Sequence, residues 1–224
     1  MFKQSACVVV GVCALAGSTS GALVPLMPGA GAGLSGTTSA ADPVLGGAIL
    51  QDLDSPTTFA DQIFEFEIFD GMVLLYSGAI QTRVVQSGET GELIFMYQLR
   101  DSMGGLNGIV TDVSITGFGG WSTDVEYRTD GPGDVGPSRA ERSAGDGDTL
   151  DFLMGNTPQL AGGVESNFFF ALTDAPSFGL IGVAEIFIQG GFSTTVDVYA
   201  PAIPAPGALA MAGLAGLALV RRRR

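Results

Sequence analysis

The chain contains no histidine, its only lysine is Lys3, and its only cysteines are Cys7 and Cys13. Without histidine, a Ser-His-Asp or Cys-His nucleophile system cannot form. The same shortage, with no cysteine beyond residue 13, argues against a zinc, copper or haem site. A chain without interior lysine also has no P-loop and no Schiff-base lysine. What remains is the chemistry of carboxylates, hydroxyl groups and surfaces.

Positive charge is scarce away from the two ends of the sequence. All 23 acidic residues lie between Asp42 and Asp197, and the same stretch contains only five arginines. Its formal charge is therefore −18, against −13 for the whole chain. Such a charge repels nucleic acid, whose affinity for proteins comes largely from neutralised phosphates. Hydrophobic residues make up 46% of the chain, which is too many for disorder along its whole length. The length of 224 residues predicts one domain with appendages.

The N-terminus has the composition of an export signal. An apolar run over 6–16 follows Lys3 and has the length of a signal-peptide core, about 7–15 residues. Small residues at Ser20 and Ala22 then predict cleavage after Ala22. A Gly/Ser-rich stretch follows the run without amphipathic periodicity, which argues against a buried helix. We therefore predict that 1–22 is a signal peptide handled by the Sec export machinery and signal peptidase.

The C-terminus combines a short motif, an apolar stretch and a basic end. Pro204, Ala205 and Pro206 precede the apolar stretch 207–220, and the four arginines at 221–224 close the chain. As a helix, the 14 apolar residues rise about 21 Å, less than the roughly 30 Å of a hydrocarbon core. The arginines would hold this helix on the cytoplasmic side of the bilayer. The segment is therefore expected to anchor the chain transiently.

This layout over 201–224 resembles the PEP-CTERM sorting signal of bacterial surface proteins, which has a Pro-Glu-Pro motif, a short apolar helix and an arginine-rich end. The resemblance implies that an exosortase, an integral-membrane transpeptidase-like protease, processes the tail at the motif. The chain departs from the family at Ala205, where the motif has glutamate. The alternative is a tail-anchored membrane protein that is never cleaved. The residues carried over by the resemblance are Pro204, Ala205, Pro206, Arg221, Arg222, Arg223 and Arg224.

Between the two ends, we expect a flexible Gly/Ala/Ser spacer over 23–43 and an ordered domain over 44–200. Alternation dominates the domain: Phe64, Phe66 and Ile68 alternate with glutamates, and the run 168–170 of three phenylalanines indicates a buried central strand. Eight to ten short strands separated by turn residues predict an all-β antiparallel β-sandwich, jelly-roll or Ig-like. The signal helix and the short C-terminal helix would flank it.

Two binding sites are candidates within this domain. The first is a Ca²⁺ site, because aspartates and turn-forming glycines crowd one stretch and hard oxygen ligands suit calcium. Its spacing matches neither an EF-hand nor an iterated repeat, and the alternative is an exposed acidic hairpin loop. The second is sugar stacking on Trp121, whose alternative is a core or sheet-edge aromatic. The candidate calcium ligands are Asp130, Asp134, Asp146, Asp148 and Asp151.

Taken together, these features predict an exported, surface-sorted structural or extracellular-matrix protein without catalytic activity. No pair of carboxylates stands out for glycoside hydrolysis among so many acids. Its expected location is the cell envelope or the extracellular space. Its expected partners are the export and exosortase enzymes and an exopolysaccharide, but not nucleic acid. The alternative function is a Ca²⁺-dependent or carbohydrate-binding adhesion module.

Overall fold

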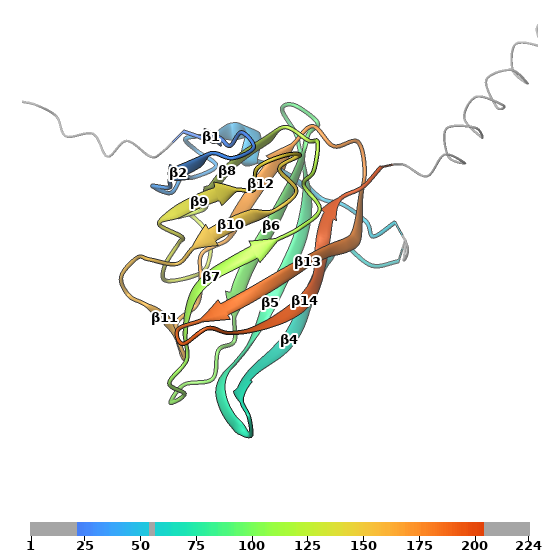
Figure 1. Cartoon of the computed structure of the whole chain (residues 1–224). Coiled ribbons are helices and arrows are strands. Elements are labelled where there is room, and N and C mark those ends of the chain that lie inside the picture. Colours follow the sequence, from blue (N-terminus) through green and yellow to red (C-terminus); the bar gives the residue numbers. More distant parts are fainter. Residues whose placement is uncertain (1–21, 54–56, 204–224) are drawn as a thin grey trace, which may run out of the picture.

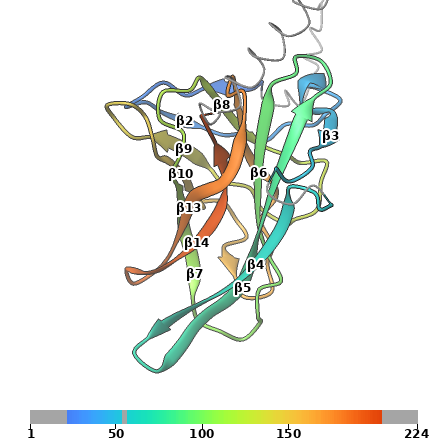
Figure 2. The same ribbon diagram turned by 90° about the vertical axis from the view of Figure 1, so that its right-hand side faces the viewer.

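The computed structural model describes residues 22–53 and 57–203 of this chain, and these form two antiparallel β-sheets (Figures 1 and 2). The expected all-β class is therefore confirmed. Within the described residues the one helical element is a short 3-10 turn, η1 (Pro43–Leu45). The predicted signal segment up to residue 21 and the predicted sorting tail from residue 204 lie outside the described residues, so the two flanking helices expected there stay a prediction.

The first sheet has the strand order β1-β8-β12-β6-β5-β3, and β4 pairs with β5 beside β3. Its central strands β12 and β6 pair in register from Phe169 opposite Tyr97 to Thr173 opposite Leu93. The bounds of its strands are β1 (Val24–Pro25), β3 (Gly47–Ile49), β4 (Asp61–Asp70), β5 (Val73–Ser87), β6 (Leu93–Arg100), β8 (Thr123–Tyr127) and β12 (Phe169–Thr173).

The second sheet has the strand order β14-β13-β7-β10-β9-β2, and β11 pairs with β7. The hairpin of β9 and β10 places Leu150 opposite Arg142 and Leu153 opposite Arg139. The bounds of its strands are β2 (Gly31–Gly33), β7 (Ile109–Ile115), β9 (Arg139–Arg142), β10 (Leu150–Leu153), β11 (Leu160–Ala161), β13 (Phe178–Ile188) and β14 (Phe192–Pro201).

The main hydrophobic core lies between the facing sides of the two sheets. Phe95 and Phe169 of the first sheet and Phe152 and Ile186 of the second are fully buried in one cluster. The rings of Phe152 and Phe169 meet across the core with centroids 4.8 Å apart. Each such side chain contributes roughly 1.5–3 kcal/mol on burial. The two sheets are therefore held face to face by apolar packing (Figure 2).

A smaller core covers part of the outer face of the first sheet. Phe168 and Phe170 point to this side while Phe169 points to the main core, because successive strand residues face opposite ways. Leu45 of the η1 turn, Met96 and Leu172 close the cluster. Since β12 is buried on both faces, the prediction of a central strand at the phenylalanine run is confirmed.

The expected flexible spacer over 23–43 is wrong, because this segment is built into both sheets. Strand β1 pairs Val24 with Val125, β2 pairs Gly31 with Glu141, and Leu26 is fully buried in the main core. Backbone pairing at a sheet edge needs no large side chains, so glycine and alanine can form an edge strand. Two buried leucines, Leu26 and Leu34, then fix the segment more firmly than its average composition indicates.

Candidate functional site

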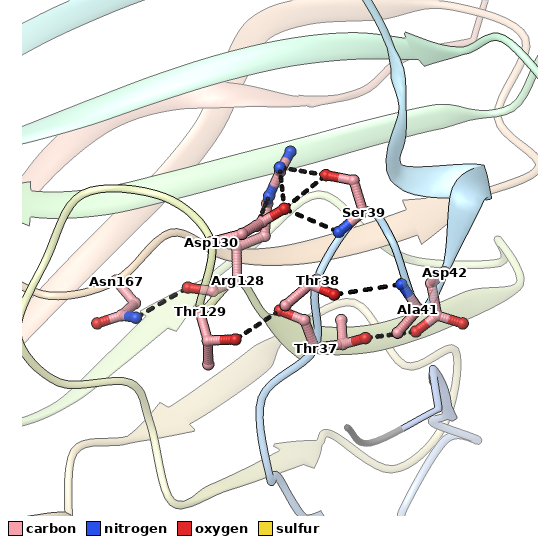
Figure 3. Close-up of polar contacts among 9 residues, drawn as sticks. All are labelled: Thr37, Thr38, Ser39, Ala41, Asp42, Arg128, Thr129, Asp130 and Asn167. Atoms are coloured by element: carbon pink, nitrogen blue, oxygen red, sulfur yellow. Dashed lines mark hydrogen bonds and ion pairs between the residues drawn. The ribbon is translucent and has the colours of Figure 1, made fainter. Parts of the chain in front are cut away.

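The predicted calcium ligand Asp130 takes part in a polar network that joins the end of β8 to the segment around Ser39 (Figure 3). Arg128 donates to Asp130 Oδ1 through Nε at 2.8 Å and to Oδ2 through Nη2 at 2.9 Å. The amide and hydroxyl of Ser39 donate to Oδ2 at 2.9 and 2.7 Å. The Arg128 hydrogen bonds, aided by those from Ser39, hold the pKa of Asp130 well below its usual range.

The same network continues along the backbone. Thr37 forms a bridge with Arg128, and both the amide and the hydroxyl of Thr129 donate to the carbonyl of Thr37, at 2.8 and 3.1 Å. The hydroxyl of Thr37 donates to the carboxylate of Asp42 (Figure 3). Asp130 thus serves to fasten the segment from Thr37 to Asp42 onto β8, with its carboxylate already engaged by four donors.

The other four predicted ligands have different partners. Asp134 accepts the Glu165 amide at 3.0 Å, and Asp151 accepts the hydroxyl of Ser114. Asp148 accepts the amides of Gly117 and Gly119 at 3.2 Å each, and an added Cβ at Gly119 would lie 3.2 Å from oxygens of both Asp146 and Asp148. Across residues 22–53 and 57–203, no three acidic, histidine or cysteine residues gather where they could hold a metal ion. The structure therefore brings Asp146 and Asp148 together, and the described residues do not assemble the calcium site expected from the five aspartates.

A buried arginine that was not among the predicted site residues organises the loops around Asp146. Arg142, at the end of β9, is only 5% exposed, and its guanidinium donates to four backbone carbonyls instead of an acid. Burial lowers the pKa of Arg142, an effect that the negative charge of Asp146 opposes. The four carbonyls belong to Gly147 at 2.8 Å, Leu26 at 2.9 Å, Phe118 at 2.9 Å and Trp121 at 2.8 Å.

Arg142 and Asp148 together fix the loop between β7 and β8. Arg142 binds the carbonyls of Phe118 and Trp121, while Asp148 binds the amides of Gly117 and Gly119. Hydrogen bonds to charged groups are worth roughly twice those between neutral groups. The backbone that carries Trp121 is thus held through both its donors and its acceptors.

Beside this loop lies a hollow of about 400 Å³, which we name the Trp121 hollow. Trp121 is half-buried, and Asp124 and Asp146 also line the space. Burial, and secondarily the charge of Glu92, raises the pKa of Asp124. An aromatic wall beside carboxylate acceptors can stack a sugar ring and accept hydrogen bonds from its hydroxyl groups. The remaining lining residues are Pro25, Met27, Pro28, Gly120, Ser122, Thr123 and Arg142.

A fully buried acid, Glu126, was also missed by sequence reasoning. Its carboxylate accepts the amides of Gly36 at 3.0 Å, Tyr127 at 3.1 Å and Ser35 at 3.2 Å. Burial raises the pKa of Glu126, although these hydrogen bonds act in the opposite direction. A buried acid with a raised pKa can mark a catalytic site, but Glu126 is 0% exposed and surrounded by backbone amides. It supports the turn at Gly36, whose φ of 80° favours glycine.

No protein-family model, curated protein or solved structure matches this chain. The likeness to a sorting signal therefore depends on the sequence of 201–224, of which the motif, the apolar stretch and the arginines lie outside the described residues. In the part of the chain that the structure describes, no helix is long and apolar enough to span a bilayer. The geometry of the described domain is the remaining guide to function.

Proposed function

We propose that this chain is an exported bacterial protein that is sorted to the cell surface and serves as a structural component of the extracellular matrix. The observation that carries the proposal is the tail, in which the motif at 204–206, the apolar stretch 207–220 and the arginines at 221–224 follow one another as in PEP-CTERM signals. The leader over 1–22 supplies entry to the Sec machinery. An exosortase-type enzyme then processes the tail.

The described domain supports this assignment in two ways. Its two facing sheets fit a β-sandwich, an architecture common in surface proteins, and we propose this finer assignment. After β14, residues 202 and 203 leave the domain at the end opposite to the β4–β5 turn (Figure 1). A chain anchored through its tail would therefore hold that turn away from the membrane.

Expression of the full chain in a bacterium that has an exosortase tests sorting. Removal of 204–224 is expected to release the protein into the medium, because the segment that holds the chain at the membrane is removed. Replacement of the four arginines at 221–224 by glutamines is the matched variant, since it leaves the motif and the apolar stretch in place. Unchanged cell association of the truncated chain would contradict the proposal.

A second candidate function, carbohydrate binding, is favoured by the Trp121 hollow. The only tryptophan of the chain lines a hollow together with two carboxylates, and Arg142 holds its backbone in place. Trp121→Ala is expected to weaken binding to an exopolysaccharide about three- to tenfold, whereas Trp121→Phe retains a stacking face. Equal retention of both variants in polysaccharide affinity gels would count against this role. The described residues give no comparable support to a calcium-dependent adhesion module.

A further inference from the structure

A second hollow, of about 350 Å³, lies where the loop after β8 meets the loop after β10. We name it the Asn167 hollow, and it shares no lining residue with the Trp121 hollow. Polar groups dominate its wall. The lining residues are Tyr127, Thr129, Asp134, Val135, Gly136, Asn156, Thr157 and Asn167.

Two side-chain amides of this hollow are fixed with their oxygens unused. Asn167 Nδ2 donates to the carbonyl of Arg128 at 2.8 Å, and Asn156 Nδ2 donates to the carbonyl of Gly136 at 2.9 Å. Only the nitrogen of an amide can donate, so these bonds set the orientation of each group. In Figure 3 the oxygen of Asn167 points away from Arg128. The two amides therefore offer acceptors to any molecule that enters.

The oxygen of Asn167 is an acceptor that the described residues leave without a donor. The side chain is 8% exposed, and its Oδ1 is buried with no hydrogen-bond partner among the described residues. The backbone amide of Asn167 donates to the carbonyl of Val135 at 2.8 Å, and its side-chain Nδ2 is held by the carbonyl of Arg128. A buried acceptor without a donor is unfavourable, and a native structure tends to supply one. An incoming donor would remove this penalty.

The neighbouring groups are also acceptors. Asp134 accepts the Glu165 amide through Oδ2, which leaves Oδ1 for another donor. Thr129 also lines the hollow, and because its hydroxyl donates to the carbonyl of Thr37, its oxygen is left to act as an acceptor. Together with the two amide oxygens, these groups match a molecule that carries several hydroxyl donors.

The size of the hollow favours a sugar over a metal ion as its ligand. Its volume of about 350 Å³ falls at the lower end of the roughly 300–1,000 Å³ typical of small-ligand sites and is about tenfold larger than a single water. The wall also has one carboxylate, Asp134, whereas Ca²⁺ sites usually combine several. We propose that the Asn167 hollow binds one sugar residue of a polysaccharide, whose hydroxyl groups donate to Asn167 Oδ1, Asn156 Oδ1 and Asp134.

The test is titration of the full chain, in mild detergent, with methyl glycosides of the common hexoses while the side-chain amide NMR signals of Asn156 and Asn167 are followed. Saturable shifts of both signals are expected at millimolar sugar. Asn167→Ala should weaken binding about tenfold, since a hydrogen bond is lost. If that variant does not fold, the sugar affinity of Asn156→Ala and Thr157→Val tests the same hollow, because these two residues are more exposed than Asn167.

The control is Asp146→Asn, which alters the Trp121 hollow and should leave these shifts unchanged. Three results at the Asn167 hollow itself would overturn the proposal. They are amide signals that no glycoside shifts, affinities that Asn156→Ala and Asn167→Ala leave unaltered, or shifts that CaCl₂ alone produces. Loss of binding in Trp121→Ala with normal binding in Asn167→Ala would place the sugar in the other hollow and also contradict it.

Discussion

The guanidinium of Arg142 donates to the backbone carbonyl of Trp121 at 2.8 Å, so a buried cation holds the residue that forms the wall of a surface hollow. The same side chain reaches Leu26, in the N-terminal segment, and Gly147, in the β9–β10 turn. Three chain segments distant in sequence are thereby joined. A wall built on such a support needs little ordering when a ligand arrives, which favours binding.

The first prediction concerns this support. Arg142→Lys is expected to lower the free energy of unfolding by about 2–4 kcal/mol, because a lysine ammonium cannot reach four carbonyls and leaves buried acceptors unpaired. Urea denaturation of the full chain measures it. Arg139→Lys is the matched control, since Arg139 is exposed and pairs with Glu141 at the surface, and it should change stability by less than about 0.5 kcal/mol. Equal effects of the two substitutions would refute the structural role of Arg142.

The second prediction concerns pH and Glu126. Burial raises the pKa of Glu126 in the folded state, so the free energy of unfolding is higher below the unfolded-state pKa and falls as pH rises through the folded-state pKa. Glu126→Gln keeps an acceptor for the Gly36 amide and removes the charge. The melting temperature of the variant relative to the natural chain should therefore increase from pH 4 to pH 7.

Asp130 provides a control of opposite sign. Its pKa is lowered by Arg128 and Ser39, so its contribution to stability is present above the unfolded-state pKa and is lost as pH falls through the folded-state pKa. Asp130→Asn should be least stable relative to the natural chain near neutral pH and approach it in acid. If both variants followed the same pH trend, the two environments would have been assigned wrongly.

The third prediction tests whether the N-terminal segment belongs to the domain. Leu26→Ala is expected to cost about 2–5 kcal/mol, because Leu26 is 1% exposed and its truncation leaves a cavity. Leu53→Ala is the same chemical change at a side chain that is 61% exposed, and it should cost less than about 0.5 kcal/mol. Urea denaturation distinguishes them, and a Leu26→Ala chain as stable as Leu53→Ala would mean that 23–43 is a spacer after all.

Alternation in the sequence was enough to predict strands such as β4, where Phe66 and Ile68 are buried and Glu65 and Glu67 are exposed. It could not predict β1 and β2, because edge pairing of small residues leaves no hydrophobic period. The strand order could not be predicted from the sequence either, since the pairing of β1 with β8 joins residues about 100 positions apart.

Proximity in sequence also misled the search for a metal site. Asp130 and Asp134 precede β9, whereas Asp146 and Asp148 lie in the turn after it. A strand of four residues separates the Cα atoms at its two ends by about 10 Å. Among the described residues, no three acidic side chains converge where they could share one ion. By contrast, the partners of Arg142 are backbone carbonyls, which carry no signature in the sequence.

The most direct test of the central claim is the intact mass of the protein recovered from the surface of cells that have an exosortase. Processing at both ends predicts a mass that lacks 1–22 and the residues beyond the 204–206 motif, and Ala205→Glu should increase the processed fraction because it restores the family motif. Recovery of the unprocessed chain of 22.9 kDa from both the natural sequence and the Ala205→Glu variant would contradict the account.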